Sequence, residues 1–428
     1  MESILVYGGR PLSGTVRVEG AKNSALKLMA ASILAPGATR LRNVPDIADV
    51  AVMAEVLEHL GVHVSRADHG LEIDATSITT HETPYELVAK MRASTAVLGP
   101  LVARTGEASV AMPGGCNIGS RKIDMHIRGL EQLGVEIGFE HGYIHARAPK
   151  RGLSGAKVTL EFASVGATEN MLTASVTARG TTVIENAARE PEIVDLASFL
   201  ASMGARIEGA GTSVITVEGV DELAPTSHEV VGDRIEAGTF LVAGALGGGP
   251  VTVEGFDPQH LGIVVAKLRD AGCRVDCEEG RATIAAPCPL RPVDVQTLPY
   301  PGFPTDMQAQ FMVLMSTAPG GSIISENVFE NRFMVAGELA RMGADIRIEG
   351  HHALVRGVER LSAAPVVSTD LRGGAALVLA GLVADGCTRV SDIHHVDRGY
   401  ERFVEKLAAL GARIERIRED AIDEREPR

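Results

Sequence analysis

The sequence contains no tryptophan, and aromatic residues make up only 4% of its 428 residues. Any hydrophobic core must therefore be built mainly from alanine, valine, leucine, isoleucine and methionine. No apolar run reaches the length of about 18 residues that a membrane-spanning helix needs, so we expect no membrane segment. The first residues, MESILVYGGR, also lack the basic and then apolar pattern of a signal peptide.

Cysteine and positive charge are scarce as well. The five cysteines are scattered and odd in number, which disfavours a disulfide framework and is typical of a cytoplasmic protein. The net charge of −14 argues against a broad nucleic-acid-binding face, although the 41 basic residues could still form a small anion pocket. Without a P-loop, a dinucleotide-binding glycine motif or zinc-ligand spacing, we expect neither a metal nor a cofactor. The oligomeric state is left open.

A helix exit recurs six times along the chain. An amphipathic helical pattern ends at a glycine and is followed by an alternating strand, as in LEHLGVHV (57–64) and KLAALGARI (406–414). A glycine at this place suits the left-handed backbone conformation that ends many helices. The six glycines lie about 70 residues apart, a period that indicates repeats. They are Gly61, Gly134, Gly204, Gly272, Gly343 and Gly411.

Between these exits lie alanine-rich helical stretches, such as MLTASVTARG (171–180) and ALVLAGLVADG (376–386), which are apolar nearly all round. Helices of this kind are buried, so we expect sheets to pack around them. The period is longer than that of usual solenoids, and the chain is too long for one ordinary core. The sequence therefore predicts an α/β protein of two closed domains with three repeats each. A linker-like stretch, 222–234, lies near the seam.

The polar residues at the starts of the alanine-rich helices differ between repeats. Lys22, Arg92 and Arg372 are cations at corresponding places, and Asn23 follows the first of them. Helix N-termini attract anions through free N–H groups and the helix dipole, so these cations indicate anion-binding sites. The alternative is that they are helix caps and surface ion pairs.

Two further arginines and one aspartate precede helices in polar surroundings. Arg332 and Arg398 each follow an acidic residue, and each can bind a carboxylate or phosphate ligand or simply pair with its neighbour. Asp306, in the loop YPGFPTDMQAQ, is the best candidate for a catalytic base. An aspartate at this place is also a common helix cap, and the residues alone leave both possibilities open.

One cysteine differs from the other four. Cys116 lies in the glycine-rich stretch MPGGCNIGSRKIDMH (112–126), and the cations Arg121 and Lys122 follow it. Neighbouring cations favour the reactive thiolate form of a cysteine. A loop cysteine without a role is the alternative. Cys273 and Cys387 lie where other repeats have alanine or threonine, so we expect them to be inert.

Taken in order, these motifs resemble the enolpyruvyl transferase family, and within it the UDP-N-acetylglucosamine 1-carboxyvinyltransferases. The matching stretches are GAKNSAL (20–26), MRAS (91–94), PGGCNIGSRKIDMHI (113–127), SVGATEN (164–170), ENAAREPEIVDLA (185–197), FPTDMQAQF (303–311), ENRFM (330–334), TDLRGGAALVLAG (369–381) and DRGYER (397–402). The resemblance implies a two-domain inside-out α/β barrel of six βαβαββ-type repeats, three per domain, with helices inside. One domain would comprise 1–21 and 230–428 and the other 22–229, with the active site in the cleft between them.

The resemblance also implies a reaction. The enolpyruvyl group of phosphoenolpyruvate would be transferred to the 3′-hydroxyl of UDP-N-acetylglucosamine, and phosphate would leave after addition and elimination through a tetrahedral ketal. This is the first committed step of bacterial peptidoglycan synthesis. One group must protonate the methylene carbon, another must take the hydroxyl proton, and cations must hold the anionic substrate.

The resemblance assigns roles by position. Cys116 resembles the general acid, and Asp306 resembles the base or the group that orients the sugar hydroxyl. The ligands of phosphoenolpyruvate would be Lys22, Arg121 and Arg398, with Arg332 and Arg372 as further cations. The residues that resemble the sugar-nucleotide site are Asn23, Arg92, Arg121, Lys122, Ile123, Asp124, Met125, Ser164, Val165, Gly166 and Val328.

Two positions bear on how far the resemblance reaches. Some relatives have a lysine where this chain has Phe162, so one contact to the diphosphate is expected to be missing or supplied elsewhere. Some relatives replace the loop cysteine by aspartate; this chain keeps Cys116, and we expect alkylation and inhibition by fosfomycin. Three rival functions are a shikimate-pathway enolpyruvyl transferase, which lacks the PGGCNIG loop, an enolpyruvyl transferase of secondary metabolism, and a non-catalytic sugar-nucleotide sensor.

Overall fold

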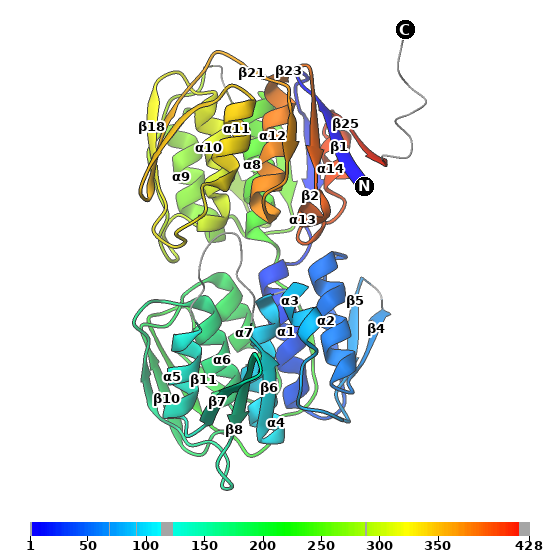
Figure 1. Cartoon of the computed structure of the whole chain (residues 1–428), viewed down its shortest axis with the longest axis vertical. Helices are drawn as coiled ribbons and strands as arrows, with labels where there is room; N and C mark the ends of the chain where they lie inside the picture. The colour runs from blue at the N-terminus through cyan, green and yellow to red at the C-terminus, as the bar shows by residue number, and fades with distance from the viewer. Residues whose placement is uncertain (1, 68, 91, 113–122, 287–288, 419–428) are drawn as a thin grey trace. The chain divides into compact units, whose positions relative to one another are not determined.

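The computed structural model describes residues 2–67, 69–90, 92–112, 123–286 and 289–418. These residues form two compact units (Figure 1). Unit 1 contains the described residues of 1–19 and 232–428, and unit 2 contains those of 20–116 and 121–231. The chain leaves unit 1 after Glu19 and returns to it at Gly232.

Unit 2 is built around three largely buried helices, α1 (Lys22–Ala31), α4 (Leu98–Thr105) and α6 (Val165–Ser175). The outer helices, each with one buried face, are α2 (Ala48–His59), α5 (Asp124–Gln132) and α7 (Pro191–Ser202). Its short helices are η1 (Ser32–Leu34), α3 (Tyr85–Lys90) and η2 (Arg92–Val97).

Three sheets surround these helices in unit 2. The first sheet, β13–β3–β5–β4, consists of β3 (Ala38–Arg42), β4 (His63–Ala67), β5 (Gly70–Asp74) and β13 (Ser227–Glu229). The second, β6–β8–β7, consists of β6 (Glu107–Ala111), β7 (Glu136–Glu140) and β8 (Tyr143–Arg147). The third, β11–β12–β10–β9, consists of β9 (Lys157–Thr159), β10 (Thr181–Glu185), β11 (Arg206–Glu208) and β12 (Val214–Glu218).

Unit 1 repeats this plan with the buried helices α8 (Arg234–Gly247), α10 (Gln308–Ser316) and α12 (Leu371–Val383). Its outer helices are α9 (Gly262–Asp270), α11 (Met334–Arg341) and α14 (Phe403–Ala409), and its short helices are η3 (Pro258–Leu261), η4 (Thr305–Met307) and α13 (His394–Asp397).

Unit 1 has three larger sheets and one strand pair. The sheet β15–β16–β14–β2 consists of β2 (Gly14–Arg17), β14 (Val251–Glu254), β15 (Arg274–Glu278) and β16 (Arg281–Ala285). The sheet β17–β18–β20–β19 consists of β17 (Val295–Gln296), β18 (Gly321–Ser325), β19 (Asp345–Glu349) and β20 (His352–Arg356). The sheet β22–β24–β1–β25 consists of β1 (Glu2–Tyr7), β22 (Pro365–Val367), β24 (Cys387–Ser391) and β25 (Arg413–Arg418), and β21 (Leu361–Ser362) pairs with β23 (Ala384–Asp385).

The six larger sheets share one strand order. An edge strand runs parallel to the first strand of the repeat, and two antiparallel strands complete the sheet. In the first sheet, for example, His228 pairs with Leu41 in parallel, whereas Thr39 and Ile73 are antiparallel partners. In the three-stranded sheet a parallel bridge between Glu82 and Ser109 takes the place of the edge strand.

Strands distant in sequence close both units. In unit 2, β13 near the end of the unit pairs with β3 of its first repeat. In unit 1, β1 lies between β24 and β25, and β2 pairs with β14. Both units are therefore closed rather than open arrays, as the repeat period predicts. The stretch 222–234, expected to be a linker, contains strand β13.

The predicted helix exits are Schellman motifs. All six glycines have positive φ, between 86° and 108°. In each motif the glycine N–H donates to the carbonyl three residues back, and the next N–H donates to the carbonyl five residues back, as in Gly61 to Glu58 and Val62 to Leu57. The glycine is required because residues with a side chain rarely adopt this backbone conformation.

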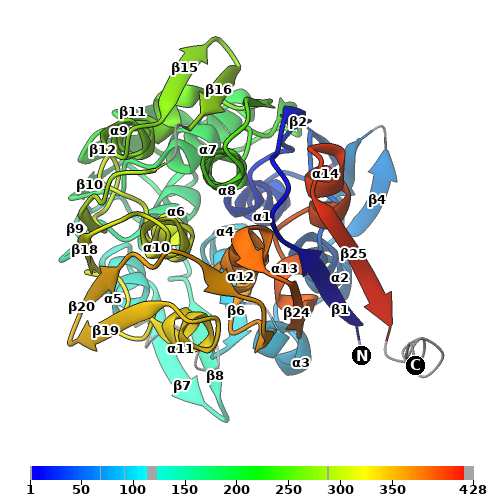
Figure 2. The ribbon, with the colours of Figure 1, turned by 90° about the horizontal axis from the view of Figure 1, so that it is seen from above.

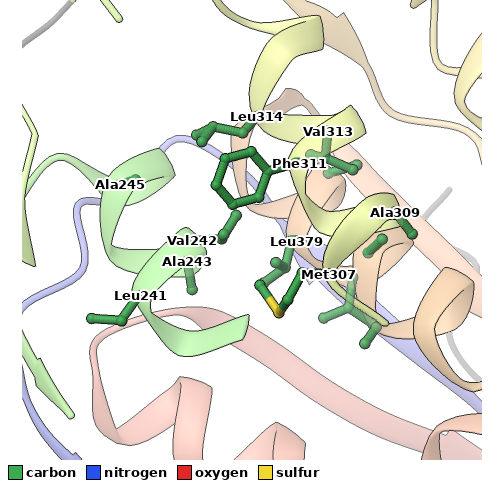
Figure 3. Close-up of a cluster of buried hydrophobic side chains, with 14 of the residues drawn as sticks. Leu241, Val242, Ala243, Ala245, Met307, Ala309, Phe311, Val313, Leu314 and Leu379 are labelled. Carbon is green, nitrogen blue, oxygen red and sulfur yellow. The ribbon is translucent and has the colours of Figure 1, made fainter. Parts of the chain in front are cut away.

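The core of unit 1 lies between its three central helices, which pack against one another inside the ring of sheets (Figure 2). Because these helices are contacted from every side, they are apolar all round. The close-up in Figure 3 shows α8, α10 and α12 side chains facing one another. Phe311, which is fully buried, makes an edge-to-face contact with Phe303 at 4.8 Å between ring centroids. Among the described residues, no helix has the length and apolar character needed to cross a bilayer.

Candidate active site

Asp306 lies between two buried arginines of unit 1. Its Oδ1 accepts a hydrogen bond from Arg332 Nη2 at 2.7 Å, and its Oδ2 accepts from Arg372 Nε at 3.2 Å and Nη2 at 3.1 Å. The arginine side chains are 5% and 3% exposed, whereas that of Asp306 is 24% exposed. The carboxylate is therefore held from two sides and still open to a ligand. Among the described residues it is the shared ion-pair partner of both arginines.

This geometry decides two alternatives that the sequence left open. Asp306 lies inside η4, whose N-cap is Pro304, so it is not a helix cap. Arg332 pairs with Asp306 rather than with its neighbouring acid. Asp397, the neighbour of Arg398, pairs instead with Arg416 at 2.7 Å.

A network of polar side chains lies beside Arg372. Its Cζ lies 5.2 Å from the centroid of the Tyr400 ring, and Tyr400 Oη is 3.0 Å from Thr239 Oγ1. Gln310 Nε2 donates to the same Thr239 hydroxyl at 3.0 Å. Burial raises the pKa of Tyr400 above its usual value, so the phenol is neutral at physiological pH. Arg372 Nη1 is buried and has no hydrogen-bond partner in the described part of the chain.

The start of α12 is fixed by a cap. Asp370 Oδ1 accepts from the backbone N–H groups of Arg372 at 2.9 Å and of Gly373 at 3.1 Å. The other predicted residues of unit 1 lie in loops. Arg398 is the C-cap residue of α13 and is half-buried, and the half-buried Val328 donates its N–H to Glu326 Oε1 at 2.9 Å.

In unit 2, Lys22 opens the buried helix α1. Its Nζ lies 3.2 Å from Asp49 Oδ2, and the two side chains are 12% and 4% exposed. Asn23 follows it and is half-buried. Ser24, next in the same turn, donates to the carboxylate of Asp195 on α7. Asp195 also binds His228 Nε2 at 2.7 Å, so the first turn of α1 is tied to α7 and β13.

The helix α6 begins with the predicted stretch Ser164, Val165 and Gly166. Ser164 is its N-cap, and its hydroxyl accepts from Ala167 N at 3.3 Å. All three predicted residues are half-buried, which leaves the helix N-terminus accessible to an anion. Phe162, two residues earlier, is 42% exposed.

The helix α5 begins beside α6 with Ile123, Asp124 and Met125, of which Ile123 is the N-cap residue. Asp124 Oδ1 is buried and has no hydrogen-bond partner among the described residues. His126 contacts α6, where its Nδ1 lies 2.9 Å from Asn170 Nδ2. A Cβ atom at Gly166 would come within 3.0 Å of this ring, so glycine allows the close approach.

Burial dominates the protonation of this cluster. It lowers the pKa of His126 from 6.5 to about 4, and the charge of Lys27 acts in the same direction. Lys27 forms an ion pair with the buried Glu169. Burial raises the pKa of Glu169 while Lys27 lowers it, and the net shift is upward.

Not every predicted residue can be placed. Cys116, Arg121 and Lys122 lie outside the described residues. Arg92 is described only as the first residue of η2. The structure thus brings together Asp306, Arg332 and Arg372, and Lys22 with its neighbour Asn23 on α1.

Sequence reasoning missed three supporting residues. Asp49 and Glu326 lie in no motif that the sequence singles out. Asp49 binds Lys22, 27 residues away, and Glu326 binds the hydroxyl groups of Thr297 and Thr305, 29 and 21 residues away. Tyr400 lies within the motif DRGYER (397–402), and an aromatic residue so close to Arg398 could have been identified from the sequence as a candidate site residue. Of the other cysteines, Cys273 is buried, and burial raises its pKa to about 11, whereas Cys387 is exposed.

Comparison with known proteins gives one consistent result. A protein-family model described as EPSP synthase (3-phosphoshikimate 1-carboxyvinyltransferase) matches residues 6–407. A UDP-N-acetylglucosamine 1-carboxyvinyltransferase of Trichlorobacter lovleyi is 51% identical over 98% of this chain and 100% of its own length. Two further relatives are each 53% identical over 97% of this chain and at least 99% of their own lengths. They are UDP-N-acetylglucosamine 1-carboxyvinyltransferase 2 of Carboxydothermus hydrogenoformans and UDP-N-acetylglucosamine 1-carboxyvinyltransferase of Corynebacterium jeikeium.

Solved structures agree in fold. The enolpyruvyl transferase NikO from Streptomyces tendae is 28% identical and superposes with a TM-score of 0.88 over 97% of this chain and 98% of its own. EPSP synthase from Acinetobacter baumannii, at 17% identity, gives a TM-score of 0.75 over 98% of this chain and 100% of its own. The predicted inside-out α/β fold of six repeats is therefore confirmed.

Proposed function

The chain belongs to the family of enolpyruvyl transferases whose model is described as EPSP synthase, and from this we propose that it transfers the enolpyruvyl group of phosphoenolpyruvate to the 3′-hydroxyl of UDP-N-acetylglucosamine. The observation that carries the proposal is about half identity, over nearly the whole length, to several proteins named UDP-N-acetylglucosamine 1-carboxyvinyltransferase. The reaction is the first committed step of peptidoglycan synthesis. We also propose a cytoplasmic location, which the scattered, odd number of cysteines supports.

The charges of unit 1 support an anionic substrate. Arg332 and Arg372 are both buried, and one carboxylate, Asp306, is their direct ion-pair partner among the described residues. Buried cations need compensating charge, and phosphoenolpyruvate carries a phosphate and a carboxylate. We assign Lys22, Arg121 and Arg398 as its main ligands and the two arginines beside Asp306 as further cations of the pocket.

Acid–base chemistry follows from the remaining roles. Cys116 is assigned as the general acid that protonates the methylene carbon of phosphoenolpyruvate, while the sugar oxygen attacks the adjacent carbon to form the tetrahedral ketal. Asp306, a partly exposed carboxylate held by two guanidinium groups, accepts or orients the hydroxyl proton. Phosphate then leaves as the methyl group returns a proton, which restores the double bond in the product.

The sugar nucleotide is assigned to polar groups and helix N-termini. The N-terminus of α6 at Ser164, Val165 and Gly166 is accessible and suits a phosphate. The other residues assigned to this site are Asn23, Arg92, Arg121, Lys122, Ile123, Asp124, Met125 and Val328. Phe162 offers no charge there, so the diphosphate contact that lysine gives in some relatives is absent at this position.

One assay tests the function. Phosphate release from phosphoenolpyruvate is measured with UDP-N-acetylglucosamine, shikimate 3-phosphate or a bare nucleotide as the acceptor. We expect release with UDP-N-acetylglucosamine alone. Release with shikimate 3-phosphate alone would overturn the proposal in favour of the reaction that names the family model, and no release with any acceptor would favour a non-catalytic protein.

A further inference from the structure

Glu326 is a buried carboxylate at the end of β18 in unit 1, and it lies outside the predicted site. The residue is 3% exposed. Its Oε1 accepts from Thr297 Oγ1 at 2.9 Å and from the backbone N–H groups of Val328 at 2.9 Å and Phe329 at 3.1 Å. Its Oε2 accepts from Thr305 Oγ1 at 2.8 Å. These four donors are all neutral.

Among the described residues, the hydrogen-bond donors to this buried carboxylate include no cation. Burying a charge in this way is costly, so the groups that bind its donors also matter. The Thr305 hydroxyl that donates to Glu326 also accepts a hydrogen bond from Arg332 Nη1 at 3.2 Å. The same guanidinium donates from Nη2 to Asp306 at 2.7 Å. Glu326 therefore lies one hydroxyl group away from the arginine that holds the candidate base.

Glu326 reaches the same arginine by a second route. By binding the N–H groups of Val328 and Phe329 it fixes the turn that follows β18. The Phe329 ring in that turn lies 5.3 Å from Arg332 Cζ. One carboxylate thus fixes both the hydroxyl and the aromatic ring that contact Arg332, together with the Val328 backbone assigned to the sugar nucleotide.

We infer that Glu326 is a positioning residue that couples the Val328 turn to the Arg332–Asp306 pair through the Thr305 hydroxyl, an inference that rests on the proposed function. Glutamine in its place has one acceptor oxygen and one NH₂ donor, so it cannot accept from all four groups. Its NH₂ group would face Thr305, whose own proton would then lose its acceptor. The orientation of Arg332 and Asp306 would change while the backbone fold stays the same.

The test compares steady-state kinetics of the full-length wild type with those of Glu326→Gln, Thr305→Val, Thr305→Ser and the double variant Glu326→Gln/Thr305→Val. Glu338→Gln is the matched control, because Glu338 also accepts a backbone N–H, that of Val367 at 2.9 Å, and its side chain forms an ion pair with Arg341, which is not a candidate site residue. Because a small misplacement of a catalytic group costs up to about a hundredfold in rate, we expect kcat to fall about tenfold in Glu326→Gln and in Thr305→Val.

The pattern of effects distinguishes positioning from general damage. We expect the KM for UDP-N-acetylglucosamine to rise at least about threefold in Glu326→Gln, because Glu326 fixes the Val328 turn that is assigned to the sugar nucleotide. The KM for phosphoenolpyruvate should stay within about twofold, so that the loss in kcat and the loss in sugar-nucleotide binding can be read separately. Thr305→Ser, which keeps the hydroxyl, should restore kcat. The double variant should be no slower than either single variant, since both break one chain of contacts.

Several results would overturn the inference. These are unchanged kcat and sugar-nucleotide KM in Glu326→Gln, equal losses in Glu338→Gln, or effects that multiply in the double variant. If Glu326→Gln does not fold, as judged by circular dichroism, the Thr305→Val and Thr305→Ser pair decides, and equal kcat in the two would refute the inference. A wild type that releases no phosphate would overturn the proposed function and the inference with it, whereas an active wild type with unchanged variants overturns the inference alone.

Discussion

At the scale of single residues, the candidate chemistry depends on charges that the fold brings together. Asp306 is 26 residues from Arg332 and 66 from Arg372 along the chain, yet it binds both. The sequence identified all three as candidates and could not show that they are partners. Arginines next to acids in a sequence are usually interpreted as local ion pairs, and only the contacts in the folded chain show that Arg332 and Arg372 share Asp306.

Removing either proposed acid–base group should abolish most turnover. General acid or base catalysis contributes at least about a hundredfold, so Asp306→Ala and Cys116→Ser should each lower kcat by that factor or more. The measurement is phosphate release at saturating substrates. Asp385→Ala is the control, because the Asp385 side chain forms an exposed ion pair with Arg360, and neither residue is a candidate site residue. Near-normal turnover in either test variant would remove that residue from its assigned role.

Cys116 should also react with fosfomycin. The epoxide alkylates a thiolate, and the cations assigned around Cys116 favour that form. We expect loss of activity and a single adduct mass on the peptide containing Cys116, with Cys116→Ser unlabelled. Full activity at millimolar fosfomycin with no adduct would contradict the assignment.

His126 makes stability depend on pH. Its pKa is lowered from 6.5 to about 4 in the folded protein, mainly by burial, so the unfolded chain binds more protons between these values. Stability is therefore fully present above about pH 6.5 and is lost as the pH falls towards 4, by about 3 kcal/mol in total. In His126→Asn, urea unfolding of unit 2 between pH 4 and 7 should depend less on pH. An unchanged pH dependence would show that His126 does not cause it.

At the scale of elements, the recurring glycine was the most informative signal in the sequence. The alternation of a buried helix, a strand, an amphipathic helix and a hairpin could be read from the six exits, because a Schellman motif requires a left-handed residue whatever surrounds it. The edge strands could not be read in this way. The residues of β13 looked like a linker, since three residues of an edge strand carry too little pattern to identify them.

A matched pair of glycines, one inside α11 and one just after it, tests this reasoning. Gly343 follows the helix with φ of +86°, whereas Gly337 lies inside it with open space where a Cβ would be. Gly343→Ala should destabilise the protein by about 1 kcal/mol because alanine is strained at positive φ, and Gly337→Ala should stabilise it by up to about 1 kcal/mol. Urea unfolding measures both. Equal effects of the same sign would contradict the helix-exit assignment.

At the scale of the whole molecule, the two units differ in how they are closed. Unit 2 is closed by β13, which belongs to its own stretch of chain. Unit 1 is closed by β1, which lies between β24 and β25 and buries Ile4 and Val6 in the core. The N-terminal strand is thus an inner strand of a sheet whose other strands lie more than 350 residues further along the chain.

Deleting residues 2–8 should therefore unfold unit 1 selectively. The deletion leaves β24 and β25 without their shared partner and exposes the core beneath them. Hydrogen exchange followed by mass spectrometry should show lost protection in α8, α10 and α12 and retained protection in α1 and α6, which serve as the internal control. Equal protection in both units would show that β1 is dispensable.

The sequence by itself determined the class of fold, the six repeats, the helix exits and the identity of the candidate residues, because each of these depends on short-range periodicity or on motifs in a fixed order. The tertiary structure decided which charges meet. Asp306 binds two arginines, Lys22 binds Asp49, and Glu326 binds Thr305, and these partners lie 21 to 66 positions apart in the sequence. Such contacts leave no periodic trace in the sequence, since a partner's place is set by how helices and sheets pack.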